Sequence, residues 1–418
     1  MNSQSLTLST LASMEDYDPN SMPVEQARQL IQQFLSPVTE LQTIKVQEAF
    51  HRTLAADVLS PMNVPPHDYS SMDGYAVRHA GLTGSTNKLK KIGTSFAGHA
   101  FEGKVEAGEC VRIMTGAMIP TGSDSVVMQE QVKVDGDEIE ISSGHKRGQN
   151  IRLVGEDIMK DAVVLARGKQ LGAAEMGLLA SLGFAEISVY RKLKIAIFST
   201  GDELVQPGNA LASGQIYDSN RFTLIGLLTE LGADFIDMGN IRDDKESIRA
   251  ALLKASSESD VIITSGGASV GEADYIKALL DEIGEVVFWK LAMKPGRPLA
   301  YGKIGACHFF GLPGNPVAVM VTFLQFVRNA LWVLMGQNPK PAFSFQAICT
   351  TPIKKAAGRT EFQRGILTQS ADGLWEVQTT GEQGSGILSS MSRANCFIVL
   401  PVEQGNVEKG SVVKIQLF

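Results

Sequence analysis

The sequence has few cysteines, and they lie far apart. Cys110, Cys307, Cys349 and Cys396 are its 4 cysteines, and no pair has the C-x-x-C spacing of a zinc site. None of the 6 histidines falls in an HExxH motif, which argues against zinc hydrolase chemistry. The pattern therefore argues against a disulfide framework and against a structural zinc.

Common nucleotide and hydrolase motifs are also missing. Neither GxxxxGK[ST] nor GxGxxG occurs, which disfavours P-loop and dinucleotide-binding folds. No G-x-S-x-G elbow supports a Ser/His/Asp triad, although composition leaves one open. No Lys or Arg precedes Arg28, so we expect no signal or transit peptide and a cytoplasmic location.

Basic residues are fewer than acidic ones: the chain has 38 basic and 45 acidic residues, and its net charge is −7. A protein that mainly grips nucleic acid would normally show the opposite balance. With 44% hydrophobic and 20% charged residues, the chain is globular. The most apolar run, residues 317–335, is interrupted by Gln325, Arg328 and Asn329, so we expect a buried helix rather than a membrane span.

The chain of 418 residues is long enough for several domains. Apolar residues at helical spacing predict a helix from Val24 to Phe34, and another over residues 171–182 that ends at Gly183. Between them, β-type runs at 110–114, 125–134 and 138–141, the last two separated by Asp135-Gly136, predict a small β domain with a hairpin. The predicted parts are a flexible tail (1–20), a discontinuous helical linking domain (21–62 plus 150–190), an inserted β domain (63–149), an α/β domain (191–338) and a C-terminal β domain (339–418).

Strand and helix patterns alternate in the α/β domain. Strands are predicted at 194–198, 235–238, 261–264, 286–291 and 308–311, and helices at 221–231, 244–257, 273–283 and 316–334. This order predicts a doubly wound, mostly parallel sheet with helices on both sides. Ligands of such sheets bind beyond the carboxyl ends of the strands.

Loops after these strands are rich in functional residue types. In residues 199–204, Glu203 could hold a metal or orient water, or be a solvated acid of a turn. In residues 265–274, Gly266, Gly267 and Ser269 could cradle a phosphate before a helix, or form a tight turn in which Asp274 complements the helix dipole.

Two further loops contain prolines around glycine. In residues 311–316, Asn315 is the predicted N-cap and Pro316 the first residue of a helix. Lys290, Lys294 and Arg297 could form a compact oxyanion site, or a solvated basic loop.

Other candidate residues also have plain structural interpretations. Asp243 and Asp244 precede Glu246 in a D-x-x-E capping pattern. Asp73, in SMDGYA, and Thr115, in TGA, belong to glycine-containing turns. Arg152 and Asp157 flank Gly155-Glu156 and fit a salt bridge.

Taken together, SMDGYA, TGA, STGDEL, SGGASVGEAD, KPGRP and LPGNP, in this order and spacing, closely resemble the MoeA family of molybdopterin molybdenumtransferases. The family includes the C-terminal domain of the scaffold protein gephyrin, and the resemblance covers residues 21–418. It implies that molybdate is inserted into adenylylated molybdopterin with Mg²⁺-dependent release of AMP. It also implies a molybdopterin-binding α/β domain, a C-terminal domain like a β-barrel, and a homodimer whose inserted β domain completes the partner's site.

The resemblance also implies roles for individual residues. The acids around the metal and the pyrophosphate would be Asp73, Glu203, Asp243 and Asp274, the last three as metal ligands, and Asp244 could replace Asp243. Lys290, Lys294 and Arg297 would hold molybdate or phosphate oxygens. Other expected binding residues are Pro313 and Pro316 on the pterin side, Thr115, Arg152 and Asp157 near the partner subunit, and Arg364 and Ser385 in the last domain.

Alternative functions remain open at this point. The nearest is adenylylation of molybdopterin, but the proteins that perform it do not need the two flanking β domains. A scaffold, as in gephyrin, and a nucleotide pyrophosphatase built on the same α/β domain are the others. We expect other proteins of molybdenum cofactor biosynthesis as partners, and neither nucleic acid nor a membrane.

Overall fold

A computed structural model describes residues 20–266, 275–338 and 341–418. The chain divides into two compact units. Unit 1 comprises Met1–Ala55, Gly168–Gly172 and Ile187–Phe418, and unit 2 comprises Ala56–Arg167 and Ala173–Glu186. The two units are described separately below.

The centre of unit 1 is a 6-stranded sheet in the order β16-β13-β17-β21-β20-β18. Its strands are β13 (Lys194–Thr200), β16 (Asp234–Ile241), β17 (Val261–Ser265), β18 (Glu285–Lys290), β20 (Pro298–Ile304) and β21 (Cys307–Leu312). Neighbours from β16 to β21 are parallel, whereas β20 pairs antiparallel with both β21 and β18. The mostly parallel sheet is confirmed, and β20 is a strand that the sequence pattern did not reveal.

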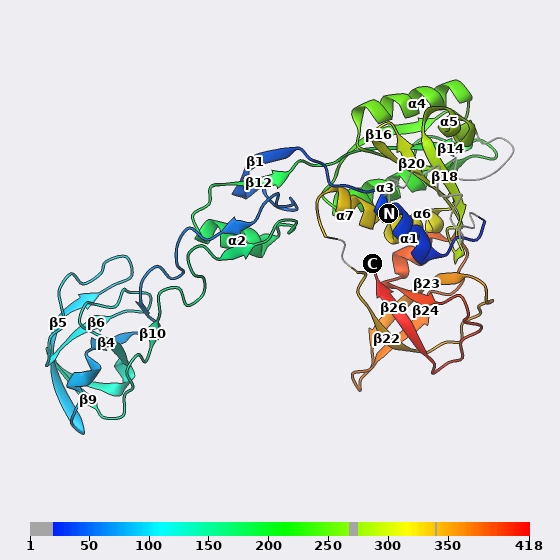
Figure 1. Cartoon of the computed structure of the whole chain (residues 1–418). Helices are drawn as coiled ribbons and strands as arrows, with labels where there is room; N and C mark the ends of the chain where they lie inside the picture. Colours follow the sequence, from blue (N-terminus) through cyan, green and yellow to red (C-terminus); the bar gives the residue numbers. More distant parts are fainter. Residues whose placement is uncertain (1–19, 267–274, 339–340) are drawn as a thin grey trace, which may run out of the picture. The chain divides into compact units, whose positions relative to one another are not determined.

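Helices cover both faces of this sheet because its central strands are apolar on both sides. In β13, Ile195 and Ile197 belong to one buried cluster while Ala196 and Phe198 belong to another. The helices are α1 (Val24–Gln33), α3 (Ser219–Glu230), α6 (Pro316–Thr322) and α7 (Arg328–Leu334) with the first cluster, and α4 (Lys245–Glu258) and α5 (Tyr275–Ile283) with the second. Figure 1 shows α4 and α5 on the face opposite α3, α6 and α7.

The long apolar run is a buried helical segment, as expected. It consists of α6, a π-helical turn at Phe323–Val327, and α7. Within the part of the chain that the structure describes, Pro316–Leu334 is the one helical run long and apolar enough to cross a membrane, and 72% of it is buried inside the protein. Its side chains complete the first cluster, which explains their hydrophobicity.

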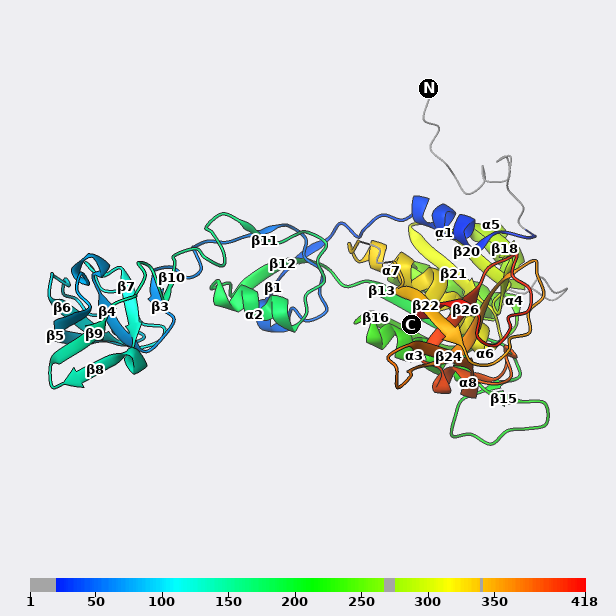
Figure 2. The ribbon, with the colours of Figure 1, turned by 90° about the horizontal axis from the view of Figure 1, so that it is seen from below.

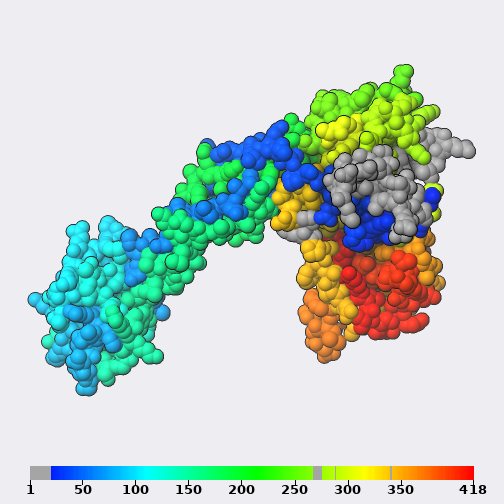
Figure 3. Space-filling view, in the orientation of Figure 1, coloured from blue at the N-terminus to red at the C-terminus, as the bar shows by residue number. Residues whose placement is uncertain are grey.

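The C-terminal part of unit 1 is a β-barrel. Its strands are β19 (Met293–Lys294), β22 (Ser344–Cys349), β23 (Thr360–Gln369), β24 (Trp375–Thr379), β25 (Cys396–Leu400) and β26 (Val412–Leu417), and α8 (Leu388–Arg393) follows β24. The order β23-β24-β22-β26-β25 closes because β23 also pairs with β25. Figure 3 shows these C-terminal residues, orange to red, packed as one body.

Unit 2 contains a second 6-stranded sheet, in the order β7-β4-β6-β5-β9-β8, which Figure 2 shows with its strands side by side. The strands are β4 (Gly74–Val77), β5 (Thr86–Ser95), β6 (Glu109–Ile113), β7 (Ser125–Met128), β8 (Val132–Asp135) and β9 (Glu138–Ser142). The predicted hairpin is confirmed: Asp135 pairs with Glu138, and Gly136 has a φ of +61°. The predicted run 125–134 is wrong as one strand, because the 3₁₀ turn Gln129–Gln131 divides it.

The remaining elements are short. In unit 1, β1 (Leu41–Lys45) pairs with β12 (Glu186–Tyr190). In unit 2, β2 (Val58–Leu59) pairs with β11 (Val163–Leu165), β3 (Tyr69–Ser70) pairs with β10 (Ile151–Arg152), and the predicted helix before Gly183 is α2 (Ala173–Ser181). These segments therefore contain more strand than the sequence pattern indicated.

Candidate active site

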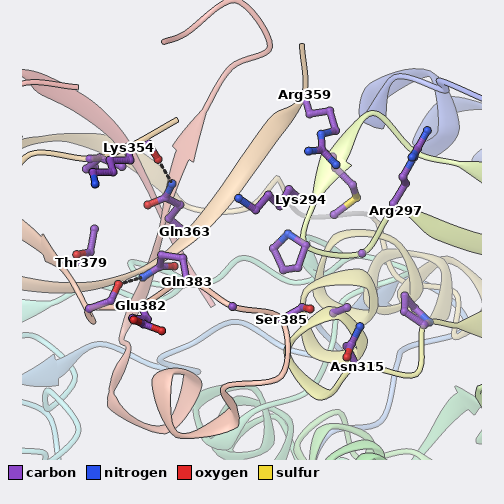
Figure 4. Close-up of a pocket in the computed structure, with 18 of the residues that line it drawn as sticks. Lys294, Arg297, Asn315, Lys354, Arg359, Gln363, Thr379, Glu382, Gln383 and Ser385 are labelled. Atoms are coloured by element: carbon purple, nitrogen blue, oxygen red, sulfur yellow. Dashed lines mark hydrogen bonds between the residues drawn. The ribbon is translucent and has the colours of Figure 1, made fainter. Parts of the chain in front are cut away.

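Unit 1 contains a pocket of about 930 Å³ between the α/β sheet domain and the β-barrel (Figure 4). Its polar and charged lining comprises Lys294, Arg297, Asn315, Lys354, Arg359, Gln363, Thr379, Glu382, Gln383 and Ser385, and Pro313 lies on its wall. Cations outnumber the single acid, Glu382, in this lining. The net positive charge of this lining suits a small anion, although the chain as a whole is acidic.

The loop with Lys294 and Arg297 is held by the barrel. Strand β19 pairs in parallel with β23, so that Lys294 lies opposite Glu361. Gly296 has a φ of +93°, and a Cβ there would lie 2.5 Å from the Thr322 hydroxyl. Only glycine allows this conformation so close to α6.

The start of α6 also lines the pocket. Asn315 is the N-cap residue and Pro316 the first residue of the helix, as predicted, although the Asn315 side chain makes no capping hydrogen bond. The Val317 N–H donates to the Ser385 carbonyl at 3.0 Å. This bond joins the Ser385 loop of the barrel to the helix beside Pro313.

Several barrel residues of the pocket were missed by the sequence interpretation. Lys354 and Arg359 add positive charge, and Gln363 and Gln383 add amides. The Gln363 amide donates to the Lys354 carbonyl at 3.2 Å. A sequence signal for Lys354 and Arg359 was the charge of segment 354–359, which contains Lys354, Lys355 and Arg359 and no acid.

Arg364 does not line the pocket, contrary to the expectation that it binds the ligand directly. Its side chain is 0% exposed, and its guanidinium donates to the Ser390 hydroxyl and the Gly384 carbonyl, each at 3.0 Å. Burial lowers the pKa of Arg364 to about 10. The residue therefore holds the loop that carries Ser385 from beneath.

Glu203 and Asp243 meet at the carboxyl edge of the sheet, where β13 and β16 end. The Asp243 N–H donates to the Asp202 carboxylate at 3.4 Å. Burial, followed by the charges of Asp202 and Glu203, raises the pKa of Asp243 above its ordinary value. Asp202 and Glu203 therefore lie close enough to Asp243 to repel its negative charge.

Asp244 cannot replace Asp243 without loss of the cap. The Asp244 carboxylate accepts from the Ser247 N–H at 2.8 Å and is the N-cap of α4. The predicted D-x-x-E pattern from Asp243 to Glu246 is therefore wrong, and the cap lies one residue later.

Gly266 lies at the same edge of the sheet. Its N–H donates to the Leu312 carbonyl at 3.3 Å, and a Cβ there would lie 2.9 Å from the Thr200 carbonyl oxygen. The loops after β13, β17 and β21 therefore touch. The proposed partners Gly267, Ser269 and Asp274 lie outside the described residues.

The carboxylate oxygens at this edge of the sheet are the kind of ligand that Mg²⁺ prefers. Glu203 and Asp243 are both exposed, and the negative charges of Asp202 and Glu203 act on Asp243 at this edge. Among residues 20–266, 275–338 and 341–418, however, no group of three or more His, Cys, Asp or Glu residues is arranged to hold a metal ion. The described acids alone do not complete a site.

Two other predicted residues of unit 1 do not line the pocket. Lys290 ends β18 and is half-buried, and its carbonyl accepts from the Met22 N–H at 3.1 Å. Pro316 is half-buried at the first position of α6. Lys290 and Pro316 each lie next to a residue that does line the pocket.

In unit 2, Asp73 and Thr115 lie together. The Asp73 carboxylate accepts from the Thr115 N–H and hydroxyl, each at 2.7 Å, and these bonds lower the pKa of Asp73. The next position, Gly74, requires glycine because a Cβ there would lie 2.0 Å from the Val127 carbonyl oxygen. Packing therefore explains the glycine of this motif, and the Asp73 carboxylate beside it is accessible.

Arg152 pairs with Glu156, at 3.7 Å, rather than with Asp157. The Asp157 side chain is exposed, and its N–H donates to the Val64 carbonyl at 3.0 Å. The predicted salt bridge between Arg152 and Asp157 is therefore wrong.

Comparison with protein families covers most of the chain. Residues 22–183 match the MoeA N-terminal region (domain I and II), and residues 196–332 match a probable molybdopterin binding domain. Residues 346–418 match the MoeA C-terminal region (domain IV). Flanking regions as well as the α/β domain therefore match.

Similar proteins agree with these matches. A molybdopterin molybdenumtransferase of Haemophilus influenzae is 48% identical over 95% of this chain and 98% of its own. Gephyrin of Dictyostelium discoideum is 34% identical over 96% of this chain and 62% of its own. A crystal structure of a molybdopterin biosynthesis MoeA protein from Pyrococcus horikoshii superposes with a TM-score of 0.83, at 30% identity, over 96% of this chain and all of that one.

Proposed function

The chain belongs to the MoeA family and is an enzyme of molybdenum cofactor biosynthesis, a molybdenumtransferase acting on molybdopterin; from that premise we propose that it takes adenylylated molybdopterin and molybdate and releases AMP. In this reaction the phosphoanhydride P–O bond breaks, water or a molybdate oxygen supplies the new oxygen on phosphorus, and AMP leaves. The molybdenum passes to the dithiolene sulfurs of the pterin: two Mo–S bonds form, and one oxo group of molybdate leaves as water with the two thiol protons.

The observation that carries this proposal is the charge of the pocket. Lys294 and Arg297 come from β19 and the loop that follows it, and Lys354 and Arg359 come from the segment before β23. Ammonium and guanidinium donors gathered from two segments suit a dianionic oxyanion or a phosphate. Ser385 adds a neutral donor that could bind one of the remaining oxygens of this anion.

We propose that Mg²⁺ supports anhydride cleavage at the acidic edge of the sheet. Glu203 and Asp243 would hold it, together with Asp274, which lies outside the described residues. When bound, the cation would stabilise the negative charge that develops on the phosphate oxygens. The proximity of the Asp202, Glu203 and Asp243 carboxylates supports this proposal.

We further propose that the protein acts in the cytoplasm as a homodimer in which Asp73 and Thr115 of one copy complete the site of the other. Their exposed hydrogen-bonded pair supports this role. Exposed apolar side chains of the same unit, including Met72 and Met159, are available for contact with a second copy.

The proposal is tested by mixing purified protein with Mg²⁺ and adenylylated molybdopterin, and then adding molybdate. We expect AMP release that depends on both ions and falls to a small residual rate in Lys294→Ala. The matched control is Lys409→Ala, an exposed barrel lysine outside the pocket, which should keep wild-type activity.

Other outcomes would contradict the proposal. AMP formed only from ATP and free molybdopterin would indicate the adenylyltransferase instead. Equal activity of Lys294→Ala and Lys409→Ala would show that the pocket is not the site. Size-exclusion chromatography with light scattering tests the dimer, and a monomer that is fully active would rule out a shared site.

A further inference from the structure

Glu361 is a buried carboxylate behind the wall of the pocket. It is 4% exposed, and it lies on β23 directly opposite Lys294 of β19. A carboxylate taken out of water costs several kcal/mol unless its oxygens find partners. Both oxygens of Glu361 are therefore expected to have partners in the protein.

The two oxygens of Glu361 have different partners. Oε2 accepts from the Gln363 amide at 2.8 Å, and Oε1 lies 3.7 Å from the Lys294 ammonium. The first distance is a hydrogen bond, whereas the second is an ion pair too long for one. Lys294 is thus attracted to Glu361 while its own hydrogen-bond donors stay available.

Lys294 also remains accessible. Its side chain is 48% exposed and lines the pocket, whereas the Glu361 side chain is 5% exposed. Figure 4 shows the Lys294 side chain extending toward Gln363, whose amide points toward Lys354. The acid is behind the wall and the cation is in front of it, so a bound anion would meet Lys294 rather than Glu361.

Gln363 extends this arrangement to the barrel. The same amide nitrogen that donates to Glu361 also donates to the Lys354 carbonyl. The chain of contacts therefore runs from Lys354 through Gln363 and Glu361 to Lys294. It connects the Lys294 ammonium to the backbone of Lys354.

We propose that Glu361 is a positioning residue that holds the Lys294 ammonium in one place for the reacting oxyanion. The inference rests on the proposed function. Glu361 does not touch the substrate; it acts through Lys294, and Gln363 orients it. Because Glu361 also places negative charge behind Lys294, its removal should misplace the cation without reducing the positive charge of the pocket.

The test is Glu361→Gln, with kcat and the KM for molybdate measured in the AMP-release assay. We expect kcat to fall by about 10- to 100-fold, as for a reacting group misplaced by about 1 Å, while KM stays unchanged or falls. Glu361→Asp, which keeps the charge, should recover part of kcat. A variant that only lost stability would not show this division between kcat and KM.

The matched control is Glu403→Gln. Glu403 is exposed in the same domain, and both acids raise the pKa of Lys355 against the effect of burial. We expect wild-type kinetics for this control. A similar loss in both variants would mean that the effect runs through Lys355, which would overturn the inference.

A double-mutant cycle tests whether Glu361 acts through Lys294. In a Lys294→Met background, adding Glu361→Gln should have almost no further effect on the residual rate. An equal loss in both backgrounds, or an unchanged kcat in Glu361→Gln alone, would overturn the inference. A wild-type protein that releases no AMP would instead overturn the proposed function, and the inference with it.

Discussion

The Asp73 carboxylate accepts hydrogen bonds from both the backbone N–H and the hydroxyl of Thr115, each at 2.7 Å. The residues are 42 positions apart in the sequence, and β6 and β4 pair to bring them together. Because these bonds stabilise the charged carboxylate, they hold the pKa of Asp73 below its ordinary value. An ionised acid is thereby presented at the end of two paired strands.

Replacing Thr115 with valine should raise the pKa of Asp73. The variant loses the hydroxyl donor but keeps the backbone donor, so the pKa should move only part of the way toward that of an ordinary aspartate. Carbon NMR titration of the Asp73 carboxyl measures it, with Thr121→Val as the control. An unchanged pKa in Thr115→Val would show that the hydroxyl contributes nothing.

Arg364→Lys should destabilise unit 1. A lysine cannot donate to both the Ser390 hydroxyl and the Gly384 carbonyl from the buried position of Arg364. We expect a loss of about 1–3 kcal/mol in urea unfolding, and weaker molybdate binding because the Ser385 loop loosens. Arg393→Lys, an exposed substitution on α8, should change stability by less than about 0.5 kcal/mol; equal losses would contradict the role of Arg364.

His308 should make unit 1 sensitive to acid. Burial first, and then the charge of Lys303, lowers the pKa of His308 to about 4. The unfolded chain takes up a proton near pH 6.5, which the folded protein resists, so stability is complete above that pH. It should fall by at most about 1.4 kcal/mol per pH unit as the pH drops from 6.5 toward 4.

Urea unfolding at several pH values, followed by the fluorescence of buried Trp289, measures this effect. His308→Gln should have a flatter pH dependence over that range, whereas the exposed His51→Gln should keep the wild-type slope. The same slope in both variants would mean that other groups cause the acid sensitivity.

Gly296→Ala should be destabilising and should also weaken molybdate binding. An alanine at a φ of +93° is strained, and its Cβ would meet the buried Thr322 hydroxyl. We expect a cost of roughly 1–3 kcal/mol, with displacement of the loop that carries Lys294 and Arg297.

The matched control is Gly226→Ala in α3. A Cβ there meets nothing within 4 Å, so this variant should gain about 0.4–1 kcal/mol of stability. Urea unfolding and calorimetric titration with molybdate measure both variants. A Gly296→Ala protein as stable as Gly226→Ala would refute the steric argument.

Local sequence patterns were sufficient for much of the architecture. Apolar runs predicted the buried strands β13, β17 and β21, because a strand covered on both faces has to be apolar throughout. Asp135-Gly136 predicted its hairpin because such turns need a residue with positive φ. Adjacent strand ends likewise brought Glu203 and Asp243 together, as the rule for parallel sheets implies.

Whether a charged residue faces the pocket or the core depended on tertiary contacts. Arg364 and Arg359 lie five positions apart, yet one is buried under the Ser385 loop and the other lines the pocket. The cap of α4 fell on Asp244 and left Asp243 beside Asp202 and Glu203.

The sequence by itself determined the family, the order of elements and most loops of the site, because propensity, periodicity and turn chemistry act over a few residues. Only the tertiary structure decided that Lys294 lies opposite Glu361 and shares its pocket with Lys354 and Arg359. That decision depends on β19 pairing with β23 across more than sixty residues of intervening chain. A pairing between strands so distant leaves no periodic signal in either segment.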